Sequence, residues 1–396
     1  MRILMLTSSY PAPGDPAWGA YLRDHIRAVR DRGNDVTVLV PSLSRGLKVR
    51  REEEGIRVVA YPYSPGTAPM LHCEQGLLPS IRKSRLARLQ LPGFLLASIY
   101  YLTLFAHRER ADLIHAHWFI PGGLAAALAR PFVRIPLVTL GHGADLHLPD
   151  RPIVRRALSF VHRRSDVSLV VSEYLRQKAG SYGLPMEEID VVRNGVDTKA
   201  FFPGRRDRNG ERIIGVARRL LPEKRVRDVV RALSGIPASE RDKLSLRIAG
   251  DGPERQRIEQ EVRSLGLRRQ VHLLGAVPHR EMPEFLRSVD FMINPSIQEG
   301  LSVGNLEALS SGLPVIACRG VGSDEAIEDG LNGFLYPPRD VETLRDSIRR
   351  MARSGQLLDR MGAAARQGAL DRFPISRVGR EWDAAYRLAL SRNESR

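Results

Sequence analysis

The chain has 396 residues and a formal net charge of +16, from 61 Lys and Arg residues against 45 Asp and Glu residues. At roughly 150 residues per domain, this length predicts two or three domains. Hydrophobic residues make up 43% of the chain and charged residues 27%, so the composition excludes wholesale disorder. A balance this basic suits nucleic acid, anionic lipid or a phosphorylated substrate as partner, or simply a well-solvated surface.

Cysteine usage and apolar runs indicate the compartment. Cys73 and Cys318 are the only cysteines, too few for a disulfide framework, and they indicate a reducing cytoplasm. The apolar start at 1–6 is too short for a signal peptide. The longest apolar stretch, 91–106, contains a proline and a glycine and falls short of the about 20 residues that span a bilayer. We therefore expect a cytoplasmic protein that does not cross a membrane.

Strand and helix patterns alternate along the chain. An apolar strand at 2–7 is followed by a loop rich in proline and glycine at 11–19 and by a helix at 21–32. A second buried strand at 35–40 completes a β-α-β unit. Further strands are predicted at 56–60, 113–116, 137–140, 169–171, 189–192, 212–217, 245–249, 271–274, 291–294 and 314–318.

The stretch Pro-Gly-Arg-Arg-Asp-Arg-Asn-Gly at 203–210 interrupts this alternation and predicts a linker between two domains. Alternating strands and helices predict mostly parallel sheets flanked by helices. The expected architecture is therefore α/β, with two Rossmann-like, doubly wound domains at 1–203 and 204–372 that face each other across a cleft.

One segment departs from the alternation. Four basic residues, Arg82, Lys83, Arg85 and Arg88, directly precede the long apolar run. A basic run beside an apolar one can dock on anionic lipid, each basic residue adding about 1 kcal/mol. The alternative is a solvated loop followed by a buried helix, so 82–105 is a candidate for peripheral membrane contact.

Common nucleotide and metal motifs are absent from the sequence. No GxxxxGK[ST] motif occurs, and no GxGxxG follows the first strand. No Asp-x-Asp pair occurs, so we expect neither a catalytic divalent metal nor another cofactor. His115 and His117 point the same way on a predicted strand, but no third ligand accompanies them, and we interpret them as structural.

Three loops in the second half carry the candidate chemistry. Arg219 and Lys224 place two cations at the carboxyl end of a strand. The Gly-Asp-Gly-Pro turn at 250–253 permits backbone to lie close to a ligand. Glu299 precedes a predicted helix, and Glu307 lies two turns inside it.

A helix N-terminus between two glutamates has a clear chemical interpretation. Its free N–H groups and partial positive charge bind phosphate. Glu299 and Glu307 can accept hydrogen bonds from hydroxyls on either side, which is the layout of ribose, diphosphate and hexose in a nucleotide sugar. Arg219 and Lys224 would neutralise the diphosphate, whose charge grows as it leaves. Each residue alone could belong to a surface ion pair, but the three loops together favour a donor site.

These loops resemble those of the retaining GT-B glycosyltransferases of family 4, the group 1 type. In that family an R-L-x-x-x-K element, a G-D-G-P turn and an E-x7-E element occur in this order. Segments outside these loops resemble the family as well: Gly19 after the first strand, D-x-x-H-x-H at 112–117, T-x-x-H-G-x-D at 139–145, N-G-V-D at 194–197 and the closing segment 373–382.

The resemblance implies catalytic roles for four residues. Arg219 and Lys224 would contact the donor diphosphate, and Glu299 would meet hydroxyls of the donor sugar. His142 would lie by the donor sugar and the acceptor.

The resemblance also implies residues that bind the donor. Glu307 would hold the ribose, while Gly19 and the backbone of Leu301, Ser302 and Val303 would line the phosphates.

Two further implications concern the fold, and three positions depart from the family pattern. Asn194 would lie at the domain junction, and a C-terminal helix within 373–396 would return to the first domain. Glycines common in the family are replaced at three positions, Ser302, Val321 and Arg225.

The implied activity is metal-independent hexosyl transfer from a nucleotide-diphosphate sugar with retention of configuration, with UDP favoured over GDP. The implied acceptor is a glycan or a lipid-linked glycan of cell-surface polysaccharide assembly, reached at the inner membrane face. No nucleic-acid partner is expected. Two alternatives stay open. One is another GT-B activity, such as a nucleotide-sugar epimerase or a glycan phosphorylase, and the other is a non-enzymatic protein that binds nucleic acid or anionic surfaces.

Overall fold

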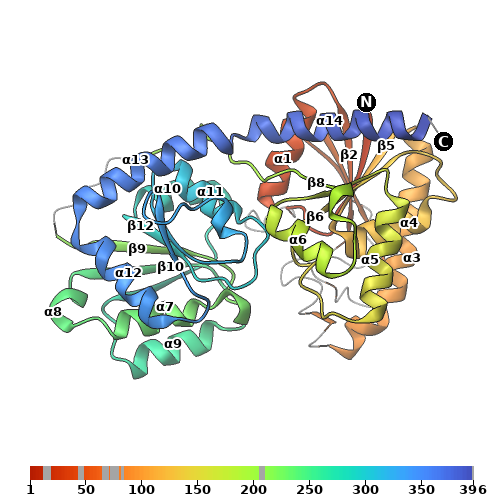
Figure 1. The fold of residues 1–396 in the computed structure, drawn as a ribbon. Helices are drawn as coiled ribbons and strands as arrows, with labels where there is room; N and C mark the ends of the chain where they lie inside the picture. Colours follow the sequence, from red (N-terminus) through yellow and green to blue (C-terminus); the bar gives the residue numbers. More distant parts are fainter. Residues whose placement is uncertain are drawn as a thin grey trace. The chain divides into compact units, whose positions relative to one another are not determined.

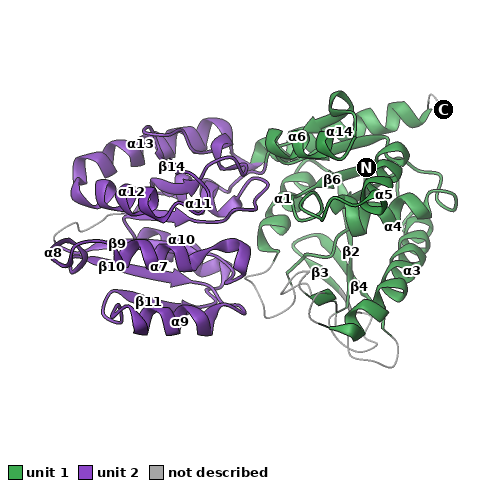
Figure 2. Cartoon of the chain, turned by 60° about the horizontal axis from the view of Figure 1, so that its bottom comes forward, with its two compact units in different colours: residues 1–14, 18–193, 376–396 green, residues 15–17, 194–375 purple. Residues whose placement is uncertain are grey.

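The computed structural model describes residues 1–11, 19–42, 49–64, 71, 80–81, 84–204 and 210–394. The chain forms two compact units (Figure 2). The N-terminal unit contains the described residues up to Arg193 and those from Ser376 onward, and the C-terminal unit contains Asn194–Ile375. Each unit is an α/β domain with its own largely parallel sheet, which confirms the predicted fold class.

The sheet of the N-terminal unit has eight strands in the order β3-β4-β2-β1-β5-β6-β7-β8. Figure 1 labels β2, β5, β6 and β8 of this sheet. Its central strands are buried along almost their whole length, as expected of parallel strands covered on both faces. The strands are β1 (Arg2–Leu6), β2 (Asp35–Pro41), β3 (Val49–Glu53), β4 (Ile56–Tyr61), β5 (Leu113–His117), β6 (Leu137–Gly141), β7 (Val167–Val170) and β8 (Ile189–Val191).

The sequence does not predict β3. Its sequence, Val-Arg-Arg-Glu-Glu, has no apolar alternation, and the strand pairs antiparallel with β4 at the edge of the sheet. Charged residues are a common feature of edge strands, where they discourage pairing with other chains. A hydrophobic pattern therefore cannot reveal this strand.

Helices connect these strands, and the last helix of the chain joins the same unit. Trp382 and Tyr386 on that helix are fully buried. The helices of the N-terminal unit are α1 (Ala20–Arg30), α3 (Arg85–Arg108), α4 (Leu124–Ala129), α5 (Pro152–Arg164), α6 (Glu173–Ser181) and α14 (Ile375–Glu394).

The helix α3 is longer than the sequence predicts. It has 24 residues and runs through Pro92 and Gly93, so by length and composition it is apolar enough to cross a membrane. This corrects the expectation that no segment reaches that length. One face, which includes Phe94, Leu102 and Phe105, is buried in the unit, and core helices of soluble proteins meet the same criterion.

The sheet of the C-terminal unit has six parallel strands in the order β11-β10-β9-β12-β13-β14. The strand order reverses between β9 and β12, and ligands of open α/β sheets bind at the carboxyl ends of the strands at such a point. The strands are β9 (Arg212–Ala217), β10 (Leu244–Ala249), β11 (Val271–Gly275), β12 (Phe291–Asn294), β13 (Val315–Cys318) and β14 (Gly333–Tyr336), the last of which was not predicted.

Seven helices accompany this sheet in the described residues of the unit, and one of them, α11, begins directly after the loop that carries Glu299. The helices are α7 (Val226–Ser234), α8 (Ala238–Arg241), α9 (Arg255–Ser264), α10 (Met282–Arg287), α11 (Val303–Ser310), α12 (Val341–Arg353) and α13 (Gly355–Arg372).

The first division between the units lies after Arg193, before the predicted domain end at 203. The reason is that the following segment packs on the C-terminal unit. Asn194 Nδ2 donates to the Leu301 carbonyl at 2.8 Å, and Arg366 Nη1 donates to the Phe201 carbonyl at 2.8 Å. Parts of several predicted features lie outside the described residues: Cys73, Arg82, Lys83, 12–18 and 205–209.

Candidate functional site

An ion pair links the loops that follow β9 and β12. Lys224 Nζ lies 2.8 Å from Glu299 Oε1 and also donates to the Gln298 carbonyl at 3.2 Å. Lys224 ends a short 3-10 turn at Pro222–Lys224, and both paired side chains are 14% exposed. Two of the residues selected from the sequence therefore meet at the carboxyl ends of neighbouring strands.

The pair is charged at neutral pH. Burial alone would raise the pKa of Glu299, but the positive charges of Lys224 and Arg218 outweigh it and lower that pKa to about 2. Burial lowers the pKa of Lys224, and the charge of Glu299 opposes this. An ionised carboxylate accepts hydrogen bonds only, and with a pKa this low it is a poor proton acceptor at neutral pH.

Arg218 joins this cluster, although the sequence motif uses only the arginine after it. Its Nε donates to Asn294 Oδ1 at 2.9 Å, and its Nη2 donates to Ser302 Oγ at 2.6 Å and Asn305 Oδ1 at 3.0 Å. Burial lowers the pKa of the guanidinium, opposed by the charges of Glu299 and Glu307. The only signal in the sequence was a pair of adjacent arginines directly after a strand.

Arg219 lies between Arg218 and Lys224 in the loop. It is half-buried, and its charge contributes to lowering the pKa of Lys224. The loop after β9 thus brings three cations into one neighbourhood.

The N-terminus of α11 opens beside these cations. Ser302 caps the helix, its Oγ accepting from the Asn305 N–H at 3.4 Å. Within the described chain, the N–H groups of Val303 and Gly304 have no hydrogen-bond acceptor. A Cβ atom at Gly304 would lie only 2.9 Å from Arg218 Nη1. Free N–H groups next to a guanidinium are suited to an anion.

The Gly-Asp-Gly-Pro turn at 250–253 packs against the loop after β9, which carries the three cations. A Cβ atom at Gly250 would lie 1.8 Å from the Arg218 carbonyl oxygen, and one at Gly252 would lie 2.6 Å from that of Leu220. The Leu220 N–H donates to the Asp251 carbonyl at 2.9 Å. The glycines thus allow a close approach between two loops, and their approach to a ligand stays a prediction.

Glu307 lies in the second turn of α11 and has a partner that the sequence did not indicate. His279 Nε2 lies 2.7 Å from Glu307 Oε1, and both side chains are largely buried. His279 also contacts the ring of Phe201, with 5.6 Å between ring centroids. The contact between His279 and Glu307 fixes the orientation of the Glu307 carboxylate.

The departures from the family pattern have local explanations. Arg225, where the family favours glycine, adopts a left-handed conformation with φ of 51° and forms two hydrogen bonds to Asp228, at 2.7 and 2.9 Å. Ser302 caps α11. Gly322 remains a glycine beside the replaced Val321, because a Cβ atom there would lie 1.7 Å from the Gly300 carbonyl oxygen.

Two predicted site residues, Gly19 and His142, belong to the N-terminal unit. Gly19 precedes α1 with φ of 73°, and a Cβ atom there would lie 3.0 Å from the backbone of Ser9 and Tyr10. His142 Nε2 lies 2.9 Å from His117 Nδ1. His117, which we interpreted as structural, therefore orients a predicted site residue.

Burial governs the electrostatics around His142. It lowers the pKa of His142 to about 3, so the ring is neutral at physiological pH. Asp145 holds the loop, accepting from the Gly143 N–H at 3.0 Å and the Phe119 N–H at 2.7 Å. Burial raises the pKa of Asp145 to about 6 despite these bonds.

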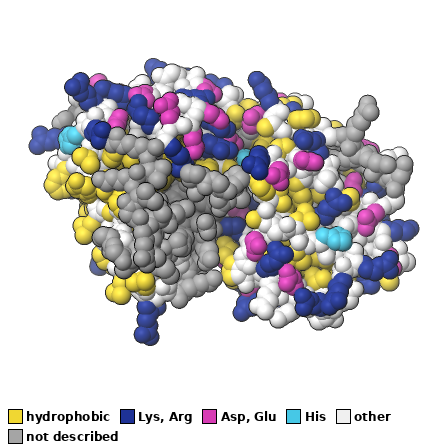
Figure 3. All heavy atoms as spheres, turned by 180° about the vertical axis from the view of Figure 1, so that it is seen from behind, with side chains coloured by type: hydrophobic (Ala, Val, Ile, Leu, Met, Phe, Trp, Pro, Cys, Tyr) yellow, Lys and Arg dark blue, Asp and Glu magenta, His cyan; other side chains and the backbone are white. Residues whose placement is uncertain are grey.

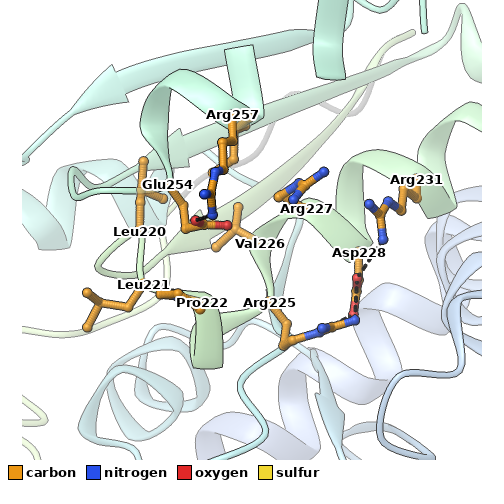
Figure 4. A pocket seen from close by; sticks show the side chains of 11 residues that line it. Leu220, Leu221, Pro222, Arg225, Val226, Arg227, Asp228, Arg231, Glu254 and Arg257 are labelled. Atoms are coloured by element: carbon orange, nitrogen blue, oxygen red, sulfur yellow. Dashed lines mark hydrogen bonds and ion pairs between the residues drawn. The ribbon is translucent and has the colours of Figure 1, made fainter. Parts of the chain in front are cut away.

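A separate pocket adjoins the loop after β9 and is lined by Leu220, Leu221, Pro222, Arg225, Val226, Arg227, Asp228, Arg231, Glu254, Arg257 and Ile258 (Figure 4). Its charges are paired, Arg225 with Asp228 at 2.7 Å and Arg257 with Glu254 at 2.7 Å. The side chains of Lys224 and Glu299 do not line it. We therefore place the candidate site at α11.

Metal ligation finds no support in the described residues, among which no group of three or more His, Cys, Asp or Glu side chains could hold a metal ion. That catalysis proceeds without a metal stays a prediction.

Comparison with known proteins matches each half of the chain to the model of a protein family. Residues 19–200 match the model for Glycosyltransferase Family 4, and residues 197–368 match the model for Glycosyl transferases group 1.

Individual relatives cover most of the chain. It is 30% identical to the N-acetyl-alpha-D-glucosaminyl L-malate synthase of Bacillus anthracis, over 75% of this chain and 80% of that protein. It is 26% identical to TuaC of Bacillus subtilis, named as a teichuronic acid biosynthesis glycosyltransferase, over 88% and 89% of the two chains. The fold is similar to that of HepE from Anabaena in complex with UDP-glucose, with a TM-score of 0.76, 21% identity and coverage of 97% and 99%.

Proposed function

Because the chain belongs to the group 1 glycosyltransferases of family 4, we propose that it transfers a hexosyl group from a nucleotide-diphosphate sugar with retention of anomeric configuration. We propose UDP rather than GDP as the nucleotide. The acceptor in this proposal is a glycan or lipid-linked glycan of cell-surface polysaccharide. The observation that carries the donor assignment is the cluster of Arg218, Arg219 and Lys224 beside the open N-terminus of α11.

The cluster suits a diphosphate leaving group. When the bond between the anomeric carbon and the diphosphate oxygen breaks, its electron pair leaves with that oxygen, and negative charge grows there. Fixed cations and N–H groups that face this charge stabilise the transition state more than the bound donor. Lys224 would neutralise the growing charge, and the first N–H groups of α11 would bind phosphate oxygens.

Glu299 fits a role as a hydrogen-bond acceptor. With its pKa lowered to about 2, it stays ionised and can accept from hydroxyls of the hexose. The proton of the attacking acceptor hydroxyl then passes to an oxygen of the departing diphosphate on the same face of the sugar. The new bond forms between the acceptor oxygen and the anomeric carbon, which retains the configuration.

The remaining assignments follow the family resemblance. Glu307, held by His279, would accept from the ribose hydroxyls. The backbone of Leu301, Ser302 and Val303 would line the phosphates. We propose that the reaction needs neither metal nor other cofactor.

Gly19 and His142 of the N-terminal unit would take part in transfer. His142 is the candidate for orienting substrate hydroxyls, because its neutral ring can both donate and accept a hydrogen bond.

The relatives support the substrate classes. HepE is solved with UDP-glucose, which supports a UDP-sugar donor. TuaC is named for teichuronic acid biosynthesis, which supports a surface polysaccharide as product.

Peripheral contact with the inner membrane face is proposed for α3. Its exposed side chains include Leu89 and Leu96, with Arg85 and Arg88 at the start of the helix. Figure 3 shows that hydrophobic side chains reach the surface in several places on the N-terminal unit. Exposed apolar and basic side chains together bind anionic lipid surfaces.

A screen of donor hydrolysis and transfer over UDP- and GDP-sugars tests the proposal. The wild type and a Lys243→Ala control, which removes an exposed lysine of the same unit, should turn over one donor equally well. Lys224→Ala should turn over that donor about 10²- to 10³-fold more slowly. Absence of turnover for every donor, or full activity of Lys224→Ala, would contradict the proposal. Release of an epimerised sugar in place of transfer would favour the epimerase alternative.

A further inference from the structure

Arg218 is the charged group for which the family motif provides no role. All three of its hydrogen bonds go to neutral oxygens, those of Asn294, Ser302 and Asn305. No carboxylate of the described residues forms an ion pair with it, although its neighbours Lys224 and Arg225 are both paired with acids. The guanidinium is half-buried, and the charges of Glu299 and Glu307 act on it only from beyond ion-pair distance. A partly buried cation without a contacting counter-ion is an unfavourable arrangement in a free protein.

The position of this guanidinium makes the arrangement less favourable still. Its Nη2 binds the capping hydroxyl of Ser302, so the cation lies at the N-terminus of α11. That end of a helix carries partial positive charge and favours anions over cations. The first turn of α11 has no acidic residue to offset the charge.

Asn305 provides a second and independent observation. It is 2% exposed, and its Oδ1 accepts from Arg218 Nη2 at 3.0 Å and from Asn294 Nδ2 at 2.8 Å. Its own Nδ2 is buried and has no hydrogen-bond partner among the described residues. Buried amide donors are almost always satisfied, so an acceptor is missing beside α11.

Several donors in this neighbourhood therefore have no acceptor among the described residues. They are Arg218 Nη1, which takes part in no hydrogen bond of the described residues, Asn305 Nδ2 and the N–H groups of Val303 and Gly304. Four donors and a net positive charge call for an oxyanion with several acceptor atoms.

We infer that Arg218 and Asn305 form an additional phosphate-binding pair of the donor site, and that Asn294 and Ser302 hold the Arg218 guanidinium in place for it. This inference rests on the proposed function, because the oxyanion is taken to be one phosphate of the donor diphosphate. An arginine serves here better than a lysine, since its planar fork can hold two neutral acceptors and still direct a third N–H group at a phosphate.

Calorimetric titration with UDP, GDP and inorganic pyrophosphate tests the inference. Arg218→Gln should weaken binding of pyrophosphate and of the preferred nucleotide at least tenfold, and Arg218→Lys should fall between it and the wild type. Arg231→Gln, a surface arginine on α7, is the matched control and should bind as the wild type does. Binding by Arg218→Gln within twofold of wild type would overturn the inference.

Asn305→Asp gives a second readout that a merely structural role would not produce. The new carboxylate would place a negative charge in hydrogen-bond contact with the Arg218 guanidinium, so the Tm of the free protein should rise and pyrophosphate affinity should fall at least tenfold. In an Arg218→Gln background Asn305→Asp should raise the Tm less, because the new carboxylate no longer has the Arg218 guanidinium as its partner. An unchanged or lower Tm together with intact pyrophosphate binding would overturn the inference.

The two levels of the proposal fail in different ways. Absence of nucleotide and pyrophosphate binding by the wild type would contradict the proposed function itself. Binding by the wild type that is insensitive to Arg218→Gln and Arg218→Lys would contradict only the role of Arg218. Should Arg218→Gln not fold, Arg218→Lys and Asn305→Asp decide the question alone.

Discussion

Lys224 Nζ and Glu299 Oε1 lie 2.8 Å apart, and this contact joins the loop after β9 to the loop after β12. Both side chains are mostly shielded from water, so their charges interact more strongly than those of an exposed pair. The contact places one cation and one anion at the strand-order reversal of the C-terminal sheet.

Replacing Lys224 by alanine should reduce kcat about 10²- to 10³-fold, the usual loss when one group that faces developing charge is removed. KM for the donor should change far less, because the charge that Lys224 meets grows only in the transition state. Steady-state kinetics on the donor identified by the screen would measure both. A rise in KM of that size with an unchanged kcat would mean that Lys224 binds the donor in the ground state and does not assist departure of the diphosphate.

The ionisation of Glu299 predicts a specific pH dependence of stability. Its pKa is about 2 in the folded chain, below the ordinary value of 4.5. The stabilising contribution is therefore complete above pH 4.5 and is lost as the pH falls from 4.5 toward 2. Urea unfolding of wild type and Glu299→Gln should show a difference in unfolding free energy that is largest at neutral pH and narrows across this window. A constant difference from pH 7 to pH 3 would contradict the account.

His142 should remain neutral throughout the pH range of activity. Because burial lowers its pKa to about 3, it contributes no limb to the rate profile between pH 5 and 8. The pKa of this histidine in the unfolded chain is 6.5, so between pH 6.5 and pH 3 the unfolded chain binds a proton that the folded chain does not bind. The folded state therefore loses stability progressively as the pH falls through this range. Nitrogen-15 NMR of the histidine rings would show a neutral His142 at pH 5, and a protonated ring there would refute this prediction.

The contact between the two glycine-bearing loops predicts a clash at Gly252. A Cβ atom there would lie 2.6 Å from the Leu220 carbonyl oxygen, and the φ of 152° disfavours other residues. Gly252→Ala should therefore lower the unfolding free energy and weaken UDP binding, since the loop that carries Arg219 and Lys224 must shift.

Gly266→Ala is the matched control for Gly252→Ala. Gly266 has φ of 69° but no atom within 4 Å of the added Cβ, so only backbone strain of about 1 kcal/mol is expected and no change in UDP affinity. Urea unfolding and calorimetry measure both effects. Equal losses in the two variants would show that the loop contact does not matter.

The fold was largely predictable because its central strands are continuous apolar runs between helical patterns. The sequence did not predict β3 and β14, and the reasons differ. β3 is an edge strand of charged residues, whereas β14 is a short apolar edge strand that begins with a glycine, a residue typical of turns. Burial and pairing, which define such strands, are properties of the assembled sheet and leave little trace in a local pattern.

The candidate site was predictable only where a motif exists. Lys224 and Glu299 stand in motifs with fixed spacing, whereas Arg218 meets Asn294 and Asn305 across 76 and 87 positions of sequence. His279 reaches Glu307 from a loop 28 positions earlier. Such contacts depend on which strand ends lie side by side, and spacing in the sequence does not supply that information.

A crystal structure of the chain with UDP, or with GDP if the donor screen selects it, tests the central claim most directly. We predict phosphate oxygens within hydrogen-bond distance of the Val303 and Gly304 N–H groups and of Arg218 and Lys224. A nucleotide bound elsewhere, such as in the arginine-lined pocket beside α7, with the N-terminus of α11 left without an anion, would contradict the account.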